Sequence, residues 1–420
     1  MTKAAAGYWK RAMAAPLVRG FVAYSASEFA SKATRLIAVI ALARMLSPVD
    51  VGIVAASMAI SELLKAFTEN GVVQKIIASP ASELQSVART ARRLFALWCA
   101  GLLVLQVFIA LGLYLWTGEA AGPIIIVLMA GEYLFMPAGI VQCGLAMREG
   151  RLSGTAAVAG AQNVAANLLL AIMVLVWPSP LAVAASRLAS APIWLVGMRR
   201  LRPWTASREY RSAPMAPFLG FGSSILGIEF LKVLRLQADK LIVGALMGPE
   251  TLGIYFFAIN AGLGIANSFA TAFSIVLFPQ FCNTKERGKT LRNALKLAAG
   301  VLLPLVCLQA VAAPIYVPLV FGSRWVEVAP LVSVLCFAAV PAIVWSTAAQ
   351  WLRAANRAEV ELVCSAFIAA FITGAIVVAA PYGLTTTVWA VLVSSTLAQL
   401  AASAAVLGRP IISSHLQLER

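Results

Sequence analysis

Charged side chains stand inside two long apolar segments, where they could bind an anion or carry a proton. The first segment holds Glu28, Lys32 and Arg35. On a helix that turns about 100° per residue, these three fall within about 60° of one another and form one polar stripe. A charge at the middle of a bilayer costs a few kcal/mol or more. We therefore expect the stripe to face protein or a water-filled cavity.

The second segment holds Glu229, Lys232, Arg235 and Asp239. Glu229 and Lys232 are spaced i, i+3, and Arg235 and Asp239 are spaced i, i+4, so each pair can form a salt bridge within a helix. Two interpretations stand for such charges. They are fixed cations that hold an anionic group, arginine bidentately and lysine as a point charge, or they are internal salt bridges that fix helix packing.

Further charges stand in other apolar segments. Glu62, Lys65 and Glu69 are spaced for one helical stripe, and Arg187 lies within a later segment. Glu132 stands alone in its segment. Burial favours the neutral form of an isolated carboxyl group, which suits a proton carrier; the alternative is a hydrogen bond to a neighbouring helix.

The segments that carry these charges are predicted to be membrane helices. Hydrophobic residues make up 61% of the chain and charged residues only 12%, whereas a soluble domain has roughly half and a quarter. Apolar runs of spanning length recur along the whole chain, which predicts an all-α polytopic membrane protein. The expected spans are residues 21–46, 51–78, 94–116, 123–147, 152–177, 181–198, 218–247, 252–281, 295–320, 331–352, 360–380 and 384–407.

These twelve spans divide into two lobes of six. We expect a cytoplasmic amphipathic lead-in at residues 1–19, an N-lobe at 20–198, a cytoplasmic linker at 199–217, a C-lobe at 218–407 and a cytoplasmic tail at 408–420. Lys and Arg number 23 in the tails and in the linkers that follow even-numbered spans, counting Lys296 at the start of the ninth span, against one, Arg324, in the other loops. This bias predicts that both termini are cytoplasmic.

The two lobes carry an internal repeat with an offset of 201 residues. Glu28 matches Glu229, Pro48 matches Pro249 and Gly52 matches Gly253 at that offset. The cations do not match, because Arg35 aligns with Leu236 and Arg235 with Thr34. We interpret the shared residues as scaffold and the unshared cations as substrate contacts.

Several functions are disfavoured by composition. The six cysteines form no CxxC pair, and the only histidine is His415 in the polar tail, so we expect no metal site and no disulfide framework. The net charge of +16 is carried mostly by short loops that set topology, so we expect no nucleic-acid partner. No pattern indicates a cofactor.

Three stretches resemble a known family. They are ALARMLSPVDVGIVAASMAI, LQADKLIVGALMGPETLGIYFFAINAG and LFPQF. These are similar to the polysaccharide transporter family, the Wzx-type O-antigen and exopolysaccharide flippases of the MOP (MATE-like) exporter superfamily. The first stretch departs from the pattern because no tyrosine follows Gly52 as Tyr255 follows Gly253.

The resemblance implies two six-helix lobes facing each other in a V around a central cavity. It implies transfer of an undecaprenyl-pyrophosphate-linked oligosaccharide from the cytoplasmic to the periplasmic leaflet of a bacterial inner membrane, by alternating access. Membrane lipids and the polysaccharide polymerase or export machinery are the further expected partners. Proton or sodium coupling is common among such transporters, and no residue pattern selects the ion.

Each charged residue then has an expected role. The expected pyrophosphate or head-group ligands are Arg35, Arg235, Lys32, Lys232 and Arg187. The residues expected to couple an ion or to pair internally are Glu28, Glu62, Glu132, Glu229 and Asp239.

Three other functions compete with this one. A MATE-like exporter of cationic drugs should have an acidic cavity, whereas the first and seventh spans are net basic; a lipid II flippase would share the fold. A polysaccharide polymerase or ligase should have a large outer loop, and the expected outer loops are each about ten residues or fewer.

Overall fold

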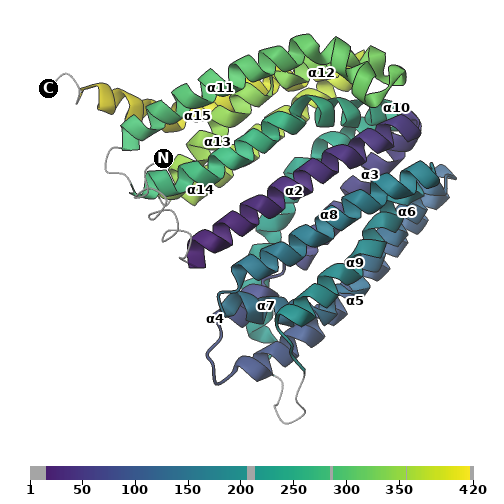
Figure 1. The fold of residues 1–420 in the computed structure, drawn as a ribbon, viewed down its shortest axis with the longest axis vertical. Helices are drawn as coiled ribbons and strands as arrows, with labels where there is room; N and C mark the ends of the chain where they lie inside the picture. Colours follow the sequence, from purple (N-terminus) through teal and green to yellow (C-terminus); the bar gives the residue numbers. More distant parts are fainter. Residues whose placement is uncertain (1–15, 206–212, 284–286, 356, 417–420) are drawn as a thin grey trace, which may run out of the picture. The chain divides into compact units, whose positions relative to one another are not determined.

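The computed structural model describes residues 16–205, 213–283, 287–355 and 357–416 (Figure 1). The described part is helical and contains no strand. Most of the expected lead-in, the middle of the expected linker and the end of the tail lie outside it. The chain divides into two compact units: the first unit is Met1–Leu46 with Ile53–Gln237, and the second unit is Ser47–Gly52 with Ala238–Arg420.

The first unit is a bundle in which α2 packs along α8, α8 along α9, and α5 along α6. Its elements are α2 (Pro16–Met45), α3 (Pro48–Lys65), η1 (Ala66–Thr68), α4 (Val72–Ala78), α5 (Leu84–Thr117), α6 (Ala121–Ala130), η2 (Gly131–Leu134), η3 (Met136–Ala138), α7 (Ile140–Arg148), α8 (Leu152–Val176) and α9 (Leu181–Leu201). The start of α3 belongs to the second unit.

In the second unit, α14 packs along α15, and α13 also contacts α15. Its elements are α10 (Ala216–Asn283), which begins in the first unit, α11 (Arg287–Tyr316), η4 (Val317–Phe321), η5 (Ser323–Val328), α12 (Ala329–Cys336), α13 (Ala339–Ala354), α14 (Ala358–Ala379), η6 (Ala380–Tyr382) and α15 (Leu384–Leu416). Helix α10 is interrupted at Gly248, where φ is 83° and ψ is 173°.

Two expected helices of the first unit are broken near their middle. The span expected at 51–78 divides into α3 and α4, because the chain tightens into η1 and then reaches Gly71 at φ 74°. The span expected at 123–147 divides into α6 and α7 through η2 and η3, where Pro137 cannot donate a backbone hydrogen bond. Continuous helices at these two places were a wrong expectation.

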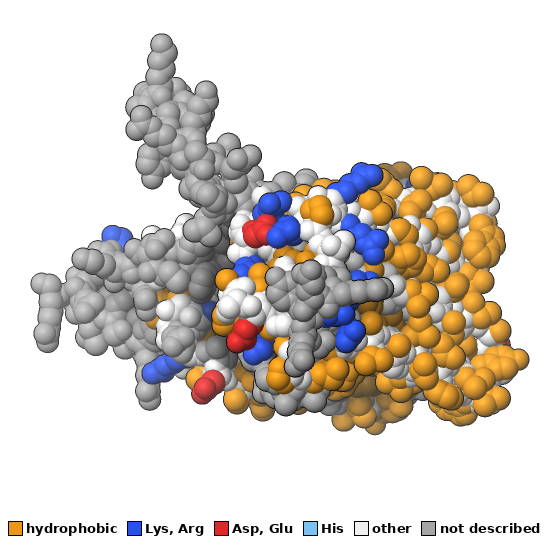
Figure 2. Space-filling view, turned by 90° about the horizontal axis from the view of Figure 1, so that it is seen from below, with side chains coloured by type: hydrophobic (Ala, Val, Ile, Leu, Met, Phe, Trp, Pro, Cys, Tyr) orange, Lys and Arg blue, Asp and Glu red, His pale blue; other side chains and the backbone are white. Residues whose placement is uncertain are grey.

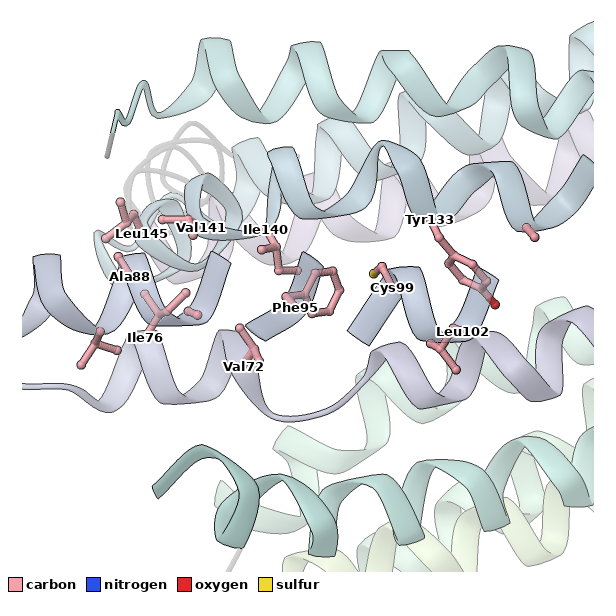
Figure 3. Packing of buried hydrophobic residues seen from close by; sticks show 13 residues of the cluster. Val72, Ile76, Ala88, Phe95, Cys99, Leu102, Tyr133, Ile140, Val141 and Leu145 are labelled. Atoms are coloured by element: carbon pink, nitrogen blue, oxygen red, sulfur yellow. The ribbon is translucent and has the colours of Figure 1, made fainter. Parts of the chain in front are cut away.

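Each unit has its own apolar core. In the first unit, Phe95 and Cys99 of α5 pack against Tyr133 of η2 and Ile140 of α7 (Figure 3). In the second unit, the core includes Phe281 and Trp345, and the ring of Phe281 meets the edge of Trp351.

Ten segments of the described residues are long and apolar enough to cross a membrane, by length and composition. This number is smaller than the twelve membrane spans that the sequence predicts. Helix α2 carries five charged residues, and the two spans expected within α10 meet at Gly248, its only non-helical residue, where the chain folds back so that Tyr255 reaches Asp239. The number twelve therefore stays a prediction.

Apolar side chains cover much of the surface (Figure 2). On α11, Leu308, Val311 and Ile315 form one face and are 68%, 77% and 71% exposed. Burying such side chains stabilises a protein in water, so an exposed face of this kind is suited to lipid.

Basic linkers meet at one end of the first unit. Arg148 donates to the carbonyl of Ile77 (2.9 Å), in the last turn of α4, and to that of Ser79, directly after it. Arg151 donates to Leu201 O (2.8 Å), at the end of α9. The linkers that follow the second, fourth and sixth expected spans therefore lie together, as alternating crossings of a membrane require.

Candidate functional site

Five charged residues from four helical elements gather inside the first unit. Arg187 of α9 donates through Nη1 to Oε1 of Glu62 on α3, at 2.8 Å. Lys65, one turn further along α3, lies 2.5 Å from Oε2 of Glu132 on η2. Arg35 of α2 interacts electrostatically with both Arg187 and Glu62. We call these five residues the charge cluster.

The local fold explains how Glu132 and Lys65 meet. Lys65 is the last residue of α3 and Glu132 is the second residue of η2, so the ion pair joins the two helix breaks. The Glu132 side chain is only 8% exposed, whereas Lys65 is 35% exposed. A carboxylate so deeply buried needs a partner, and Lys65 supplies it.

Glycines let α9 approach the second break. A Cβ at Gly131 would lie 2.7 Å from Leu188 Cδ1, and a Cβ at Gly139 would lie 2.6 Å from the ring of Trp194. Both glycines therefore allow α9 to pack against the backbone on either side of η2 and η3. This close packing holds Arg187, which precedes Leu188, beside α3.

Helix α2 is fixed against α8 at the level of the charge cluster. Asn167 of α8 donates through Nδ2 to Ser31 O (3.0 Å) and to Thr34 Oγ1 (3.2 Å). Lys32 is half-buried and Arg35 is exposed. The cluster has three cations and two carboxylates, so its formal charge is +1, and Arg35 is the cation that the surface presents.

A second charged group lies on the part of α10 that belongs to the first unit. Lys232 pairs with Glu229 at 3.0 Å, with the i, i+3 spacing that the sequence indicates. Glu69, beyond η1, interacts electrostatically with Glu229, Lys232 and Lys65. The ring of Phe230 lies beside that of Phe67, tilted by 30° and with centroids 5.1 Å apart.

The second unit holds one further predicted site residue, Asp239 of α10. Its Oδ1 lies 3.3 Å from Lys240 Nζ, and its Oδ2 accepts a hydrogen bond of 3.3 Å from the hydroxyl of Tyr255. Tyr255 is 1% exposed. The structure therefore gives Asp239 partners other than Arg235. The side chains of Glu28 and Arg235 lie outside the described residues.

The sequence indicated most of these positions but not their partners. Glu132 appeared to be isolated because Lys65 is far from it in the chain. Lys65 was placed in the stripe of Glu62 and Glu69, and it was not among the expected ligands. Two signals pointed to a break that could bring them together: the glycines Gly131, at the start of η2, and Gly139, directly after η3, and the proline Pro137. No group of three or more His, Cys, Asp or Glu in the described residues could hold a metal ion.

Solved structures of MOP superfamily transporters share this fold. An inward-facing multidrug resistance MATE family transporter matches with a TM-score of 0.68 at 13% identity, covering 90% of this chain and 94% of its own. The lipid II flippase MurJ, in an inward closed conformation, matches with a TM-score of 0.74 at 12% identity. This match covers 93% of this chain and 89% of MurJ. The chain is therefore a multi-pass membrane protein with the MOP transporter fold.

The sequence comparison narrows the class to a family. A model of the polysaccharide biosynthesis protein family matches residues 41–330, and the chain belongs to this family. It is 24% identical over 162 residues to teichuronic acid biosynthesis protein TuaB of Bacillus subtilis (strain 168) and 25% identical over 163 residues to lipopolysaccharide biosynthesis protein WzxC of Escherichia coli (strain K12).

These two matches each cover 38% of this chain and about a third of the relative, 34% of TuaB and 33% of WzxC. Family and fold together identify the chain as a polysaccharide biosynthesis protein with the fold of MOP superfamily transporters.

Proposed function

We propose that the chain is a flippase that moves an undecaprenyl-pyrophosphate-linked oligosaccharide from the cytoplasmic to the periplasmic leaflet of a bacterial inner membrane. The observation that carries this proposal is the charge cluster, which has a formal charge of +1 inside a membrane unit. Charged groups at membrane depth are costly and mark functional sites. A pyrophosphate group would pair with the gathered cations and replace their water.

Within this proposal, Arg35 and Arg187 contact the pyrophosphate in the first unit. Glu62 holds Arg187 in place until the substrate competes for it. Lys32, Lys232 and Arg235 are the further proposed ligands. The polyprenyl tail stays in lipid, and no bond of the substrate is made or broken. The coupling ion is a proton or sodium, taken up by Glu28, Glu62, Glu132, Glu229 or Asp239.

The charge balance separates this function from drug export. The MOP fold alone is shared by a multidrug resistance transporter and by the lipid II flippase MurJ. A site for cationic drugs requires surplus negative charge, whereas the charge cluster has surplus positive charge. A lipid II flippase would also bind a pyrophosphate-linked lipid, so it differs from the proposed function only in the sugar.

The test is to replace Arg187 in cells and to measure surface polysaccharide together with the amount of protein in the membrane. Arg187→Ala should abolish surface polysaccharide without preventing insertion, and Arg187→Lys should retain part of it. Arg199→Ala is the matched control, because Arg199 is exposed near the end of the same helix. Normal polysaccharide in Arg187→Ala cells would contradict the proposal. Accumulation of the lipid-linked repeat unit in the cytoplasmic leaflet would support it.

A further inference from the structure

A pocket of about 380 Å³ lies entirely within the first unit, at the point where two helices break. Residues 68–74, around the break between α3 and α4, line one side of it, and η2 and η3, between α6 and α7, line the other. Non-helical backbone at membrane depth is tolerated where it is covered by protein or lines a polar cavity. Broken helices also form the binding sites of many transporters. Two helix breaks that line one pocket therefore indicate a ligand-binding site.

The charges of the pocket largely cancel. Lys65 is bound to Glu132 at 2.5 Å, so this pair presents no net charge. Glu69 is exposed and interacts electrostatically with Lys65 and Lys232 as well as with Glu229. A free anion would be repelled by Glu69, and the attraction of a cation to Glu69 is reduced by the nearby charges of Lys65 and Lys232. The pocket therefore suits a neutral, polar ligand.

The rest of the lining combines amides with aromatic rings. Asn70 is 9% exposed and uses Oδ1 to accept from Val72 N at 3.4 Å, which leaves its NH₂ group as a donor. Gln74 and Gln162 contribute two more amides, and Trp194 contributes an indole. Amides both donate and accept, as sugar hydroxyl groups do, and an aromatic face packs against the C–H face of a sugar ring.

We propose that this pocket binds one neutral sugar ring. Its volume is at the small end of the range for ligand sites, about 300–1,000 Å³, so it holds a ring or two and not an oligosaccharide. The inference rests on the proposed function, because a pyrophosphate at Arg187 would lie one helical turn from Lys65 along α3. The sugar next to the pyrophosphate would then enter the pocket.

The test uses purified full-length protein and a panel of methyl glycosides: glucoside, galactoside, mannoside, rhamnoside and N-acetylglucosaminide. Saturation-transfer NMR would detect binding, with mannitol as an open-chain polyol control. At least one glycoside should bind, and mannitol should not. Absence of binding by every glycoside, or equal binding of mannitol, would overturn the proposal.

Variants locate the binding. Gln162→Leu removes the amide at nearly constant volume and should weaken glycoside binding about tenfold, since two hydroxyl partners are lost. Asn163→Leu is the matched control, because Asn163 is the exposed neighbour on α8 and does not line the pocket. Trp194→Phe keeps an aromatic ring in the pocket and should weaken binding less than Gln162→Leu. Equal binding by wild type and Gln162→Leu would contradict the pocket as the site.

The two proposals can fail separately. If Arg187→Ala abolishes surface polysaccharide but no glycoside binds, the sugar pocket is wrong and the flippase proposal survives. If a glycoside binds through Gln162 but Arg187→Ala cells have normal polysaccharide, the cation site for pyrophosphate is wrong.

Discussion

At the scale of the residue, the Lys65–Glu132 pair has an asymmetry that can be measured. The carboxylate is 8% exposed and the ammonium 35% exposed. Removing Lys65 leaves a buried charge without its partner, whereas removing Glu132 leaves a cation that can reach toward polar surroundings. We therefore predict that Lys65→Met lowers the free energy of unfolding by about 3 kcal/mol and that Glu132→Leu lowers it by about 1 kcal/mol.

Thermal unfolding of the purified protein would measure both changes, and the double variant completes the cycle. Lys65→Met with Glu132→Leu should be more stable than Lys65→Met alone, because no buried charge remains. The pair Arg353–Glu361 is the control because its arginine is 52% exposed, and Glu361→Gln should cost less than about 1 kcal/mol. A double variant less stable than Lys65→Met would mean that the pair is not coupled in this way.

A second prediction concerns Arg35, the exposed cation of the charge cluster. Arg35→Glu places a carboxylate beside Glu62 and changes the formal charge of the cluster from +1 to −1. Surface polysaccharide should fall at least as far as in Arg35→Ala, because a pyrophosphate would now be repelled. Staining of surface polysaccharide, normalised to protein in the membrane, would measure it. Wild-type export by Arg35→Glu would count against a basic site, and Arg44→Gln, near the end of α2, is the control.

The sequence predicted which residues are charged inside helices, but not which of them meet. Spacing within one helix correctly indicated Glu229 with Lys232, because an i, i+3 pair is fixed by helix geometry. It could not give Arg187–Glu62 or Lys65–Glu132, which join residues 125 and 67 positions apart. Such pairs depend on which helix faces are adjacent, and that is decided by packing around Gly131 and Gly139.

At the scale of the element, the repeated turn packs on its own copy within the second unit. A Cβ at Gly52 would overlap the carbonyl oxygen of Pro249, and a Cβ at Gly253 would overlap that of Pro48. This reciprocal contact explains why Ser47–Gly52 belongs to the second unit although its neighbours in sequence do not. The turn is held by Ser47, whose Oγ lies 2.7 Å from Asp50 Oδ2 and accepts from Asp50 N at 3.2 Å.

The contact predicts that neither glycine tolerates a methyl group. Gly52→Ala and Gly253→Ala should each lower the free energy of unfolding by about 3 kcal/mol, because the neighbouring atoms are backbone and cannot move aside. Gly300→Ala is the control. Gly300 lies within α11 with no atom within 4 Å of a built Cβ, and alanine should be neutral or stabilise by up to about 1 kcal/mol. Equal melting temperatures for Gly52→Ala and Gly300→Ala would contradict the contact.

The repeat was visible in the sequence. The interpretation of its shared residues as scaffold agrees with this packing. The helix breaks were not predicted, although Asn70-Gly71 at the first break is a turn signal and Pro137 at the second is a helix breaker. Hydrophobicity specifies that a segment enters the membrane, but not that its backbone stays helical. The tight turns at η1 and η2 form where neighbouring elements and the Lys65–Glu132 pair hold them.

At the scale of the whole molecule, the charge of the loops predicts a single orientation in the membrane. Loop charge is read while the chain inserts and needs no tertiary contact, so it is available from sequence alone. The grouping of Arg148, Arg151 and Leu201 at one end of the first unit agrees with alternating crossings. The sequence does not settle the number of crossings along α10, because one glycine either bends a helix or ends it. The hydrogen bond from Tyr255 back to Asp239 across Gly248 favours two crossings.

Cysteine labelling of intact cells would determine the orientation and test the number of crossings in one experiment. With the six native cysteines replaced, single cysteines would be placed at four exposed positions: Ser82, Glu119, Arg357 and Tyr382. We predict that a membrane-impermeant maleimide labels Glu119→Cys and Tyr382→Cys, whereas Ser82→Cys and Arg357→Cys react only after permeabilisation.

The reason is that Ser82 and Arg357 lie in linkers rich in Lys and Arg, which remain in the cytoplasm, while Glu119 and Tyr382 lie in loops without them. The two positions that lie before and after α10 in the sequence, Glu119 and Arg357, decide the number of crossings. Glu119 and Arg357 lie on opposite sides only if an odd number of crossings separates them, which requires α10 to cross twice, with its turn at Gly248. Labelling of Arg357→Cys in intact cells, with Glu119→Cys also labelled, would show that α10 crosses once and would reduce the twelve expected spans to eleven.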